Sequence, residues 1–267
     1  MTDAAATARV RRMLVALDAS APSLAALSAA VQMAARLGAE VAGLFVEDED
    51  LVRLGGHGAA RIIDSSSSAS RAPDAAEMGN ALRAMARAAR GALEQSAARA
   101  RLTWSFRVAR GRVAPEVVAA AAHADVVCLG RAGWFGARGA RLGSTAAAVA
   151  SSSPSHVLLV RDFGDLADAP VVLHDGSGAG SRALDLALEL CARDGGRLVV
   201  CVPRELAAHL EPEIERRAAE RGVTATIRAL GEPPAARGGL LVLPASVADD
   251  ALPQVAAAGD AALLLVR

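Results

Sequence analysis

Short apolar runs alternate with helical patterns along the first 165 residues. Residues 13–17 form a continuous apolar run, typical of a strand that is buried on both faces. Apolar positions then recur at helical spacing from Leu24, with Ser20 or Ser23 as the N-cap and Gly38 as the stop. Further strand-like runs lie at 40–46, 103–109, 125–130 and 156–161, and helical patterns lie at 78–93 and 115–124. This alternation predicts a parallel sheet with helices on both faces.

The segment from Glu47 to Pro73 shows neither periodicity. It contains an acidic run, EDED, a glycine cluster around His57 and the serine run SSSSAS. We interpret it as a surface loop in preference to a lid that closes on a ligand.

The same pattern returns in the second part of the chain. At a constant offset, Asp18 matches Asp175, Ser20 matches Ser177, and both are followed by a helical pattern. The closing run HVLLVR at 156–161 resembles ALLLVR at 262–267. Between these matches the second copy shows helical patterns at 181–193 and 204–221 and strand-like runs at 197–202, 224–230 and 240–244. Such correspondence indicates an internal repeat whose second copy is shorter.

The expected fold is α/β, with two doubly wound parallel five-stranded sheets, each in the order 3-2-1-4-5. The expected domains are residues 1–165, which carry a glycine-rich loop, and residues 166–267, a reduced copy without that loop.

Composition removes several classes of function. The chain has no lysine, which excludes a Walker-type phosphate loop, a Schiff base and a Ser-Lys dyad. Its net charge is zero and aromatic residues are few, so nucleic-acid binding is not expected. Three cysteines without Cys-x-x-Cys spacing and five scattered histidines indicate buried thiols and no metal site. The apolar stretch after Arg11-Arg12 ends at Asp18 and is too short for a membrane span, and we expect a cytoplasmic protein.

The strongest chemical signal is a glycine-rich loop after the run DVVCL. Gly130, Gly133, Gly143 and Ser144 stand at Gly-x2-Gly-x9-Gly-Ser spacing, directly before a helical pattern. Glycines let backbone N–H groups approach an anion, and a helix start offers further donors. In the expected strand order, Asp18 would face this loop across a crevice at the carboxyl ends of the strands. Asp18 could there accept ribose hydroxyl groups, or it could cap the helix beside Ser20.

The opening LVALDAS, the glycine loop and the closing HVLLVR together resemble the universal stress protein family over about residues 13–162. The resemblance implies bound ATP, with or without Mg²⁺. It places Gly130, Arg131, Gly133, Gly143, Ser144 and Thr145 around the phosphates, Asp18 at the ribose and the backbone of Val46 at the adenine. Residues 170–267 resemble the second copy of a tandem member, without the glycine loop, so we expect no nucleotide there. Members of this family pair through their last strands, so the resemblance also implies that HVLLVR pairs with ALLLVR inside the chain as an intrachain pseudo-dimer, and a homodimer of whole chains is a further option.

Two functions remain open on these grounds. The first is an ATP-binding signalling or stress-response protein with one nucleotide site, and the second is a nucleotide-free scaffold of the same fold. No nucleophile with a base and an orienting group is evident, so we expect at most slow ATP hydrolysis. An ATP pyrophosphatase is disfavoured because LDASAPS is too poor in glycine to hold phosphate after the first strand, and a flavin-binding electron carrier is a weaker alternative.

Overall fold

A computed structural model describes residues 9–55, 62–63, 70–71, 75–131, 142–161, 169–192, 195–230, 239–247 and 261–267. We call the part up to residue 161 the first half and the part from residue 169 the second half. The elements of the first half are β1 (Arg12–Ala16), α1 (Ala21–Leu37), β2 (Glu40–Asp48), α2 (Glu49–Gly55), β3 (Ile62–Ile63), β4 (Ser70–Arg71), α3 (Ala75–Ala100), β5 (Trp104–Gly111), α4 (Val113–Ala121), β6 (Val126–Gly130), α5 (Ser144–Ser152) and β7 (His156–Val160). Those of the second half are β8 (Val171–Leu173), α6 (Gly178–Cys191), β9 (Arg197–Pro203), α7 (Ala207–Glu220), β10 (Thr224–Leu230), β11 (Leu240–Pro244) and β12 (Ala262–Val266).

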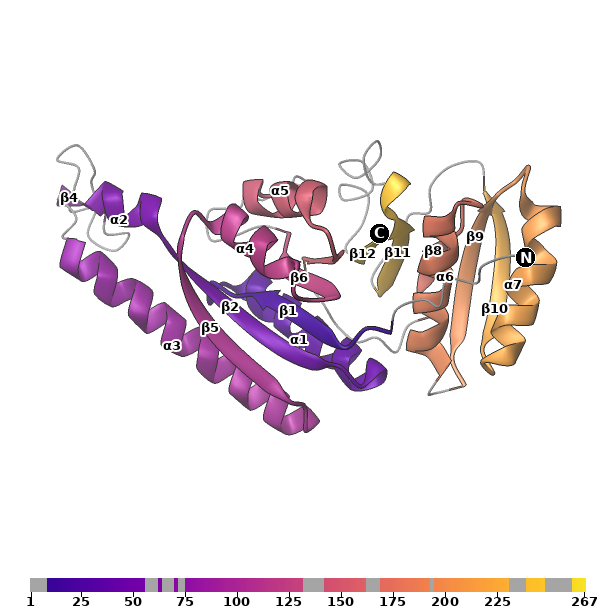
Figure 1. The fold of residues 1–267 in the computed structure, drawn as a ribbon, viewed down its shortest axis with the longest axis horizontal. Helices are drawn as coiled ribbons and strands as arrows, with labels where there is room; N and C mark the ends of the chain where they lie inside the picture. Colours follow the sequence, from indigo (N-terminus) through magenta and orange to yellow (C-terminus); the bar gives the residue numbers. More distant parts are fainter. Residues whose placement is uncertain are drawn as a thin grey trace.

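Ten strands form one continuous sheet in the order β10-β9-β8-β11-β12-β7-β6-β1-β2-β5 (Figure 1). The expectation of two separate five-stranded sheets is therefore wrong. The sheet is continuous because β7 and β12 pair antiparallel, Leu158 opposite Leu264, as the two closing runs suggested. The other neighbouring strands of this sheet pair parallel. A separate two-stranded sheet joins β3 and β4.

Helices cover both faces of the sheet. On one face α1, α3, α6 and α7 pack into a single buried cluster that spans both halves, and on the other face α4 and α5 pack over the first half (Figure 1). The central strands β6, β7, β11 and β12 are apolar and buried on both sides, whereas the edge strand β5 has exposed positions. Of the helices in the described ranges, none has the length and apolar character needed to cross a membrane.

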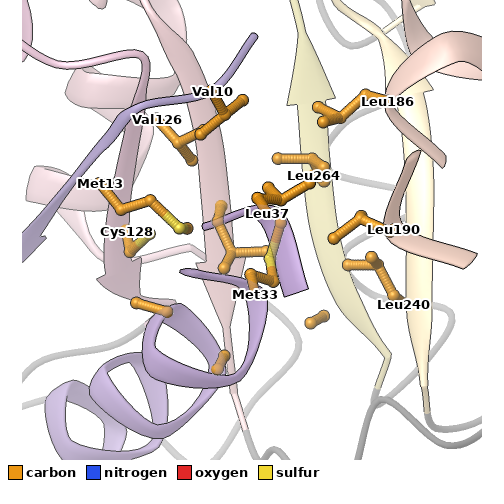
Figure 2. Close-up of a cluster of buried hydrophobic side chains, with 14 of the residues drawn as sticks. Val10, Met13, Met33, Leu37, Val126, Cys128, Leu186, Leu190, Leu240 and Leu264 are labelled. Carbon is orange, nitrogen blue, oxygen red and sulfur yellow. The ribbon is translucent and has the colours of Figure 1, made fainter. Parts of the chain in front are cut away.

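The two halves share a core where α1 meets α6. Met33 and Leu37 of α1 point toward Leu186 and Leu190 of α6, with Leu264 of β12 between them (Figure 2). Each of these side chains is at most 2% exposed. Burying five such side chains contributes about 1.5–3 kcal/mol each, so the junction is a core and not a loose contact between domains.

Local sequence signals account for the helix ends near β1. Ser20 is the N-cap of α1, and its Oγ accepts the backbone N–H of Ser23 at 3.3 Å. Gly38 ends the helix in the left-handed conformation, φ 70°, which glycine adopts without strain. Both features agree with the sequence interpretation.

The segment after β2 differs from that interpretation. Residues 47–48 extend β2, and residues 49–55 form α2, so the surface loop expected from Glu47 is wrong over these positions. Glu49 and Asp50 lie in the first turn of α2, where carboxylates stabilise a helix, and the helix is too short to show a periodic pattern. The remainder of the expected loop lies mostly outside the described residues.

Candidate functional site

A cavity of about 430 Å³ opens at the carboxyl ends of β1, β2 and β6, in the first half. The starts of α4 and α5 lie on its border, so strand ends and helix N-termini surround the same space. Seven of the eight residues expected at a nucleotide site line it: Asp18, Val46, Gly130, Arg131, Gly143, Ser144 and Thr145. The eighth, Gly133, lies outside the described residues. The structure thus brings together positions that are more than a hundred residues apart in sequence.

The backbone N–H groups at the start of α5 are suited to bind an anion. Gly143 is its N-cap, and among the described residues no side chain caps this helix. By contrast, Ser20 caps α1 and Ser177 caps α6 with their hydroxyl groups. The first turn of α5 also has no acidic residue. The first N–H groups of a helix have no partner inside the helix, so those of α5 form a donor set beside the cavity.

Asp18 stands on the opposite border, directly after β1. Its Oδ1 accepts the backbone N–H of Ser20 at 2.9 Å, and its own N–H contacts Ser23 Oγ at 3.4 Å. The local turn expected of a capping aspartate is therefore present, and it fixes the carboxylate at the cavity. Capping and ligand binding are compatible here, because a carboxylate has two oxygens and accepts several hydrogen bonds.

Apolar side chains form most of the remaining wall. Phe45 of β2, Leu82 and Met85 of α3, and Leu51 of α2 lie on one side, and Val113 and Val117 of α4 complete the lining. The sequence interpretation missed this wall. Leu82 and Met85 fall within the helical pattern expected at 78–93, but the spacing of apolar residues does not tell which end of that helix reaches the cavity.

Arg131 occupies the start of the glycine loop and is only 4% exposed. Its backbone N–H donates to the carbonyl of Val160 at 2.7 Å, and its carbonyl accepts the N–H of Gly143 at 2.7 Å. These bonds fix both ends of the loop next to β7. The guanidinium donates from Nη2 to the backbone carbonyl of Ala261, so the side chain reaches into the second half.

The equivalent place in the second half is built differently. Asp175 follows β8 as Asp18 follows β1, and both of its oxygens bond to side chains. Oδ1 accepts Ser177 Oγ–H at 2.6 Å, and Oδ2 accepts Ser246 Oγ–H at 3.2 Å. Ser246 lies directly after β11, where the first half has its glycine loop after β6. The sequence also predicts a helix start at Asp249 and Asp250, whose charges would repel a phosphate, but both lie outside the described residues.

The three cysteines are buried, and burial shifts the pKa of two histidines. Burial raises the pKa of the Cys128 and Cys201 thiols, and Cys191 is also buried and reduced, so these cysteines are packing residues as expected. Burial lowers the pKa of His156 and of His174. In the ranges that the structure covers, no group of three or more His, Cys, Asp or Glu is arranged to hold a metal ion.

The fold matches solved structures over nearly the whole chain. A universal stress protein from Archaeoglobus fulgidus is 17% identical, with a TM-score of 0.70 and coverage of 96% of this chain and 98% of that chain. A protein of unknown function from Pseudomonas aeruginosa is 11% identical, with a TM-score of 0.56 and coverage of 97% and 93%. A universal stress protein in complex with cAMP is 24% identical, with a TM-score of 0.39, and covers 57% of this chain and 98% of its own.

No curated protein sequence matches the chain. The model of the universal stress protein family matches residues 9–161, which is more than half of the chain and contains the whole cavity. The protein belongs to the universal stress protein family.

Proposed function

We propose that the cavity of the first half binds ATP and that the protein acts as a nucleotide-dependent signalling or stress-response protein. The observation that carries this proposal is the uncapped start of α5, which borders the same cavity as the carboxylate of Asp18. A helix start without a cap or acidic residue suits phosphate, and a carboxylate suits hydroxyl groups. The two groups therefore fit the two polar parts of a nucleotide.

The shape and polarity of the cavity also fit the base. Leu51, Leu82 and Met85 supply apolar surface on the α2 and α3 side, and the end of β2 brings the backbone of Val46 to the cavity. Ligand sites of a few hundred Å³ with apolar walls and few polar groups are typical of small-molecule binding. In this proposal Asp18 binds the ribose, Val46 the adenine, and Gly130, Gly143, Ser144 and Thr145 the phosphates, together with Gly133 and the backbone of Arg131. Mg²⁺ would accompany the phosphates, if it is required.

We further propose that residues 166–267 are a degenerate second copy that binds no nucleotide. In that copy Ser177 and Ser246 bond to the two oxygens of Asp175, and the sequence after β11 lacks the Gly-x2-Gly and Gly-Ser spacing that would hold phosphates. On this proposal the chain consists of a nucleotide-binding unit up to about residue 165 and a reduced unit after it. Paired through β7 and β12, the two units form an intrachain pseudo-dimer.

The alternative is a scaffold of the same fold whose cavity stays empty. Calorimetry of the purified protein with ATP separates the two, together with chromatography of any nucleotide released on denaturation. Saturable binding of one ATP per chain supports the proposal, and titrations with Mg²⁺ and with EDTA show whether the metal contributes. A protein that releases no nucleotide and gives no binding heat would leave the scaffold as the remaining function.

Hydrolysis is tested on the same preparation. We expect at most slow turnover, because the described residues around the cavity include no nucleophile paired with a base. Phosphate release well above that of a variant with a bulky residue at Gly143 would contradict this expectation.

A further inference from the structure

Two arginines connect the second half to the β6–α5 unit, which is defined here as Val126–Arg131 together with Gly143–Ser152. Between β6 and α5, the Arg131 guanidinium donates to the carbonyl of Ala261, next to β12. At the end of α5, the Arg267 guanidinium donates to the carbonyl of Ala150, in the last turn of the helix. The unit that borders the cavity is thus bonded to the second half at two places.

We propose that the second half positions the phosphate-binding start of α5 through Arg131 and Arg267, so that the site in the first half depends on the reduced copy. This inference rests on the proposed nucleotide site. It assigns Arg267 as a positioning residue, because its guanidinium bonds to Ala150 and not to a group lining the cavity.

The Arg267 contact suits the end of a helix. The last four carbonyls of a helix have no partner inside it, and Ala150 is one of them in α5. A cation at this end also interacts favourably with the helix dipole. Ala150 lies six residues after Ser144, about 9 Å along the axis at 1.5 Å per residue, so the bond orients the helix without touching a ligand at its start.

Arg267 is itself held firmly. Its backbone N–H donates to His156 Nδ1 at 3.1 Å, and its carbonyl oxygen accepts Arg182 Nε–H from α6 at 2.8 Å. These contacts connect α6, the end of β12, the start of β7 and α5. A short helix of nine residues with a free N-terminus has little stability of its own, so its orientation depends on such contacts.

Arg131 acts between the two segments of the unit, where β6 ends and the glycine loop begins. Its backbone bonds to Val160 and Gly143 close the glycine loop, and its buried guanidinium adds a bond to the second half. A buried charged donor that loses its acceptor costs more than an average hydrogen bond, so this contact resists rearrangement. The orientation of Gly143 and Ser144 at the cavity therefore depends on the position of Ala261.

The test measures ATP affinity by calorimetry in the full chain. Arg267→Met keeps the aliphatic stem but removes the donor, and we expect it to weaken ATP binding about fivefold or more, the lower range of couplings between sites. Arg131→Met should weaken binding at least as much. Arg267→Lys, which keeps a cationic donor, should recover part of the affinity.

Arg36→Met is the matched control. Arg36 also bonds across the halves, from Nη1 to the carbonyl of Leu190 at 3.4 Å, but it lies at the end of α1, away from the cavity. We expect this variant to bind ATP as the wild type does. Equal affinity of Arg267→Met and wild type would overturn the inference, and so would an equal loss in Arg36→Met, which would indicate a general effect of stability.

Hydrogen exchange on the wild type gives a test that needs no variant. Because coupling is reciprocal, ATP should slow amide exchange in residues 261–267 as well as at the start of α5. Unchanged exchange at 261–267 with ATP bound would contradict the inference. Failure of the wild type to bind ATP is a different result, because it refutes the proposed function itself.

Discussion

Placing a carboxylate at the start of α5 should stabilise the fold and remove nucleotide binding at the same time. Gly143 is the N-cap of α5 with φ −64° and ψ 156°, an extended conformation that any residue adopts. Gly143→Asp would cap the helix and meet its dipole, for a gain of about 0.3–1 kcal/mol. The loss of glycine freedom in the unfolded chain adds about 0.4–1 kcal/mol. We expect the free energy of unfolding to rise by about 1 kcal/mol.

The same carboxylate would repel ATP. A unit charge on Asp and one on a phosphate oxygen, about 5 Å apart at an effective dielectric constant of about 20, repel by about 3 kcal/mol. This corresponds to a loss of affinity of about a hundredfold or more. Gly143→Asn is the matched control, because Asn also caps helices and has nearly the same shape but carries no charge.

The assay combines urea unfolding with ATP calorimetry on both variants. Both should be as stable as the wild type or more stable, and Gly143→Asp should bind ATP far more weakly than Gly143→Asn. If the two variants bind ATP equally well, no phosphate lies at the start of α5. A marked loss of stability in both would instead show that the space around Gly143 does not admit a side chain.

Three further outcomes follow from particular contacts. Asp175→Ala should leave ATP affinity unchanged in calorimetry, because Ser177 and Ser246 already bond to this carboxylate; a measured loss would mean that both copies share one site. Leu264→Ala should lower the free energy of unfolding by about 2–5 kcal/mol in a single urea transition, because this fully buried side chain belongs to the core of both halves; two separate transitions would contradict that. Burial lowers the pKa of His174, so the unfolded chain binds more protons and stability should fall as the pH drops below about 6.5. The variant His174→Asn keeps an acceptor for the N–H of Gly176 and should lose less stability between about pH 7.5 and about pH 5, as measured by urea unfolding at both pH values. An equal loss of stability in the variant and the wild type would show that another group causes the pH dependence.

The local elements near the site were predictable because strong signals coincide there. An apolar run, a capping serine and a terminal glycine at Gly38 agree on β1 and α1, and the structure has both. The pairing of β7 with β12 was expected only from the family resemblance, since periodicity describes each strand alone and says nothing of which edges join. The expectation of two five-stranded sheets overlooked that this pairing joins them into one sheet of ten strands.

The candidate site was only partly accessible to sequence reasoning. Glycine spacing and the aspartate after β1 located both borders of the cavity. The apolar wall from α2 was missed, because a seven-residue helix with two acids in its first turn has no readable period. The bond from Arg131 to Ala261 was beyond prediction, since it joins residues far apart that share no motif. Arg131 lines the cavity as the resemblance implied, and its guanidinium also bonds to the second half.

The second half lacks the spacing of the glycine loop but keeps the strands that complete the sheet. Without β12, strand β7 would be an edge, and its side chains Val157, Leu158 and Leu159, none of them measurably exposed, would lose one flank. Exposed apolar edges invite aggregation, so β12 protects the fold of the first half. Ala261 and Arg267, which flank the same strand on its two sides, make the two contacts to the β6–α5 unit. Strand β12 and its flanking residues therefore both complete the sheet and hold the border of the cavity in place. This explains why the first copy would still need a second copy that has no glycine loop of its own.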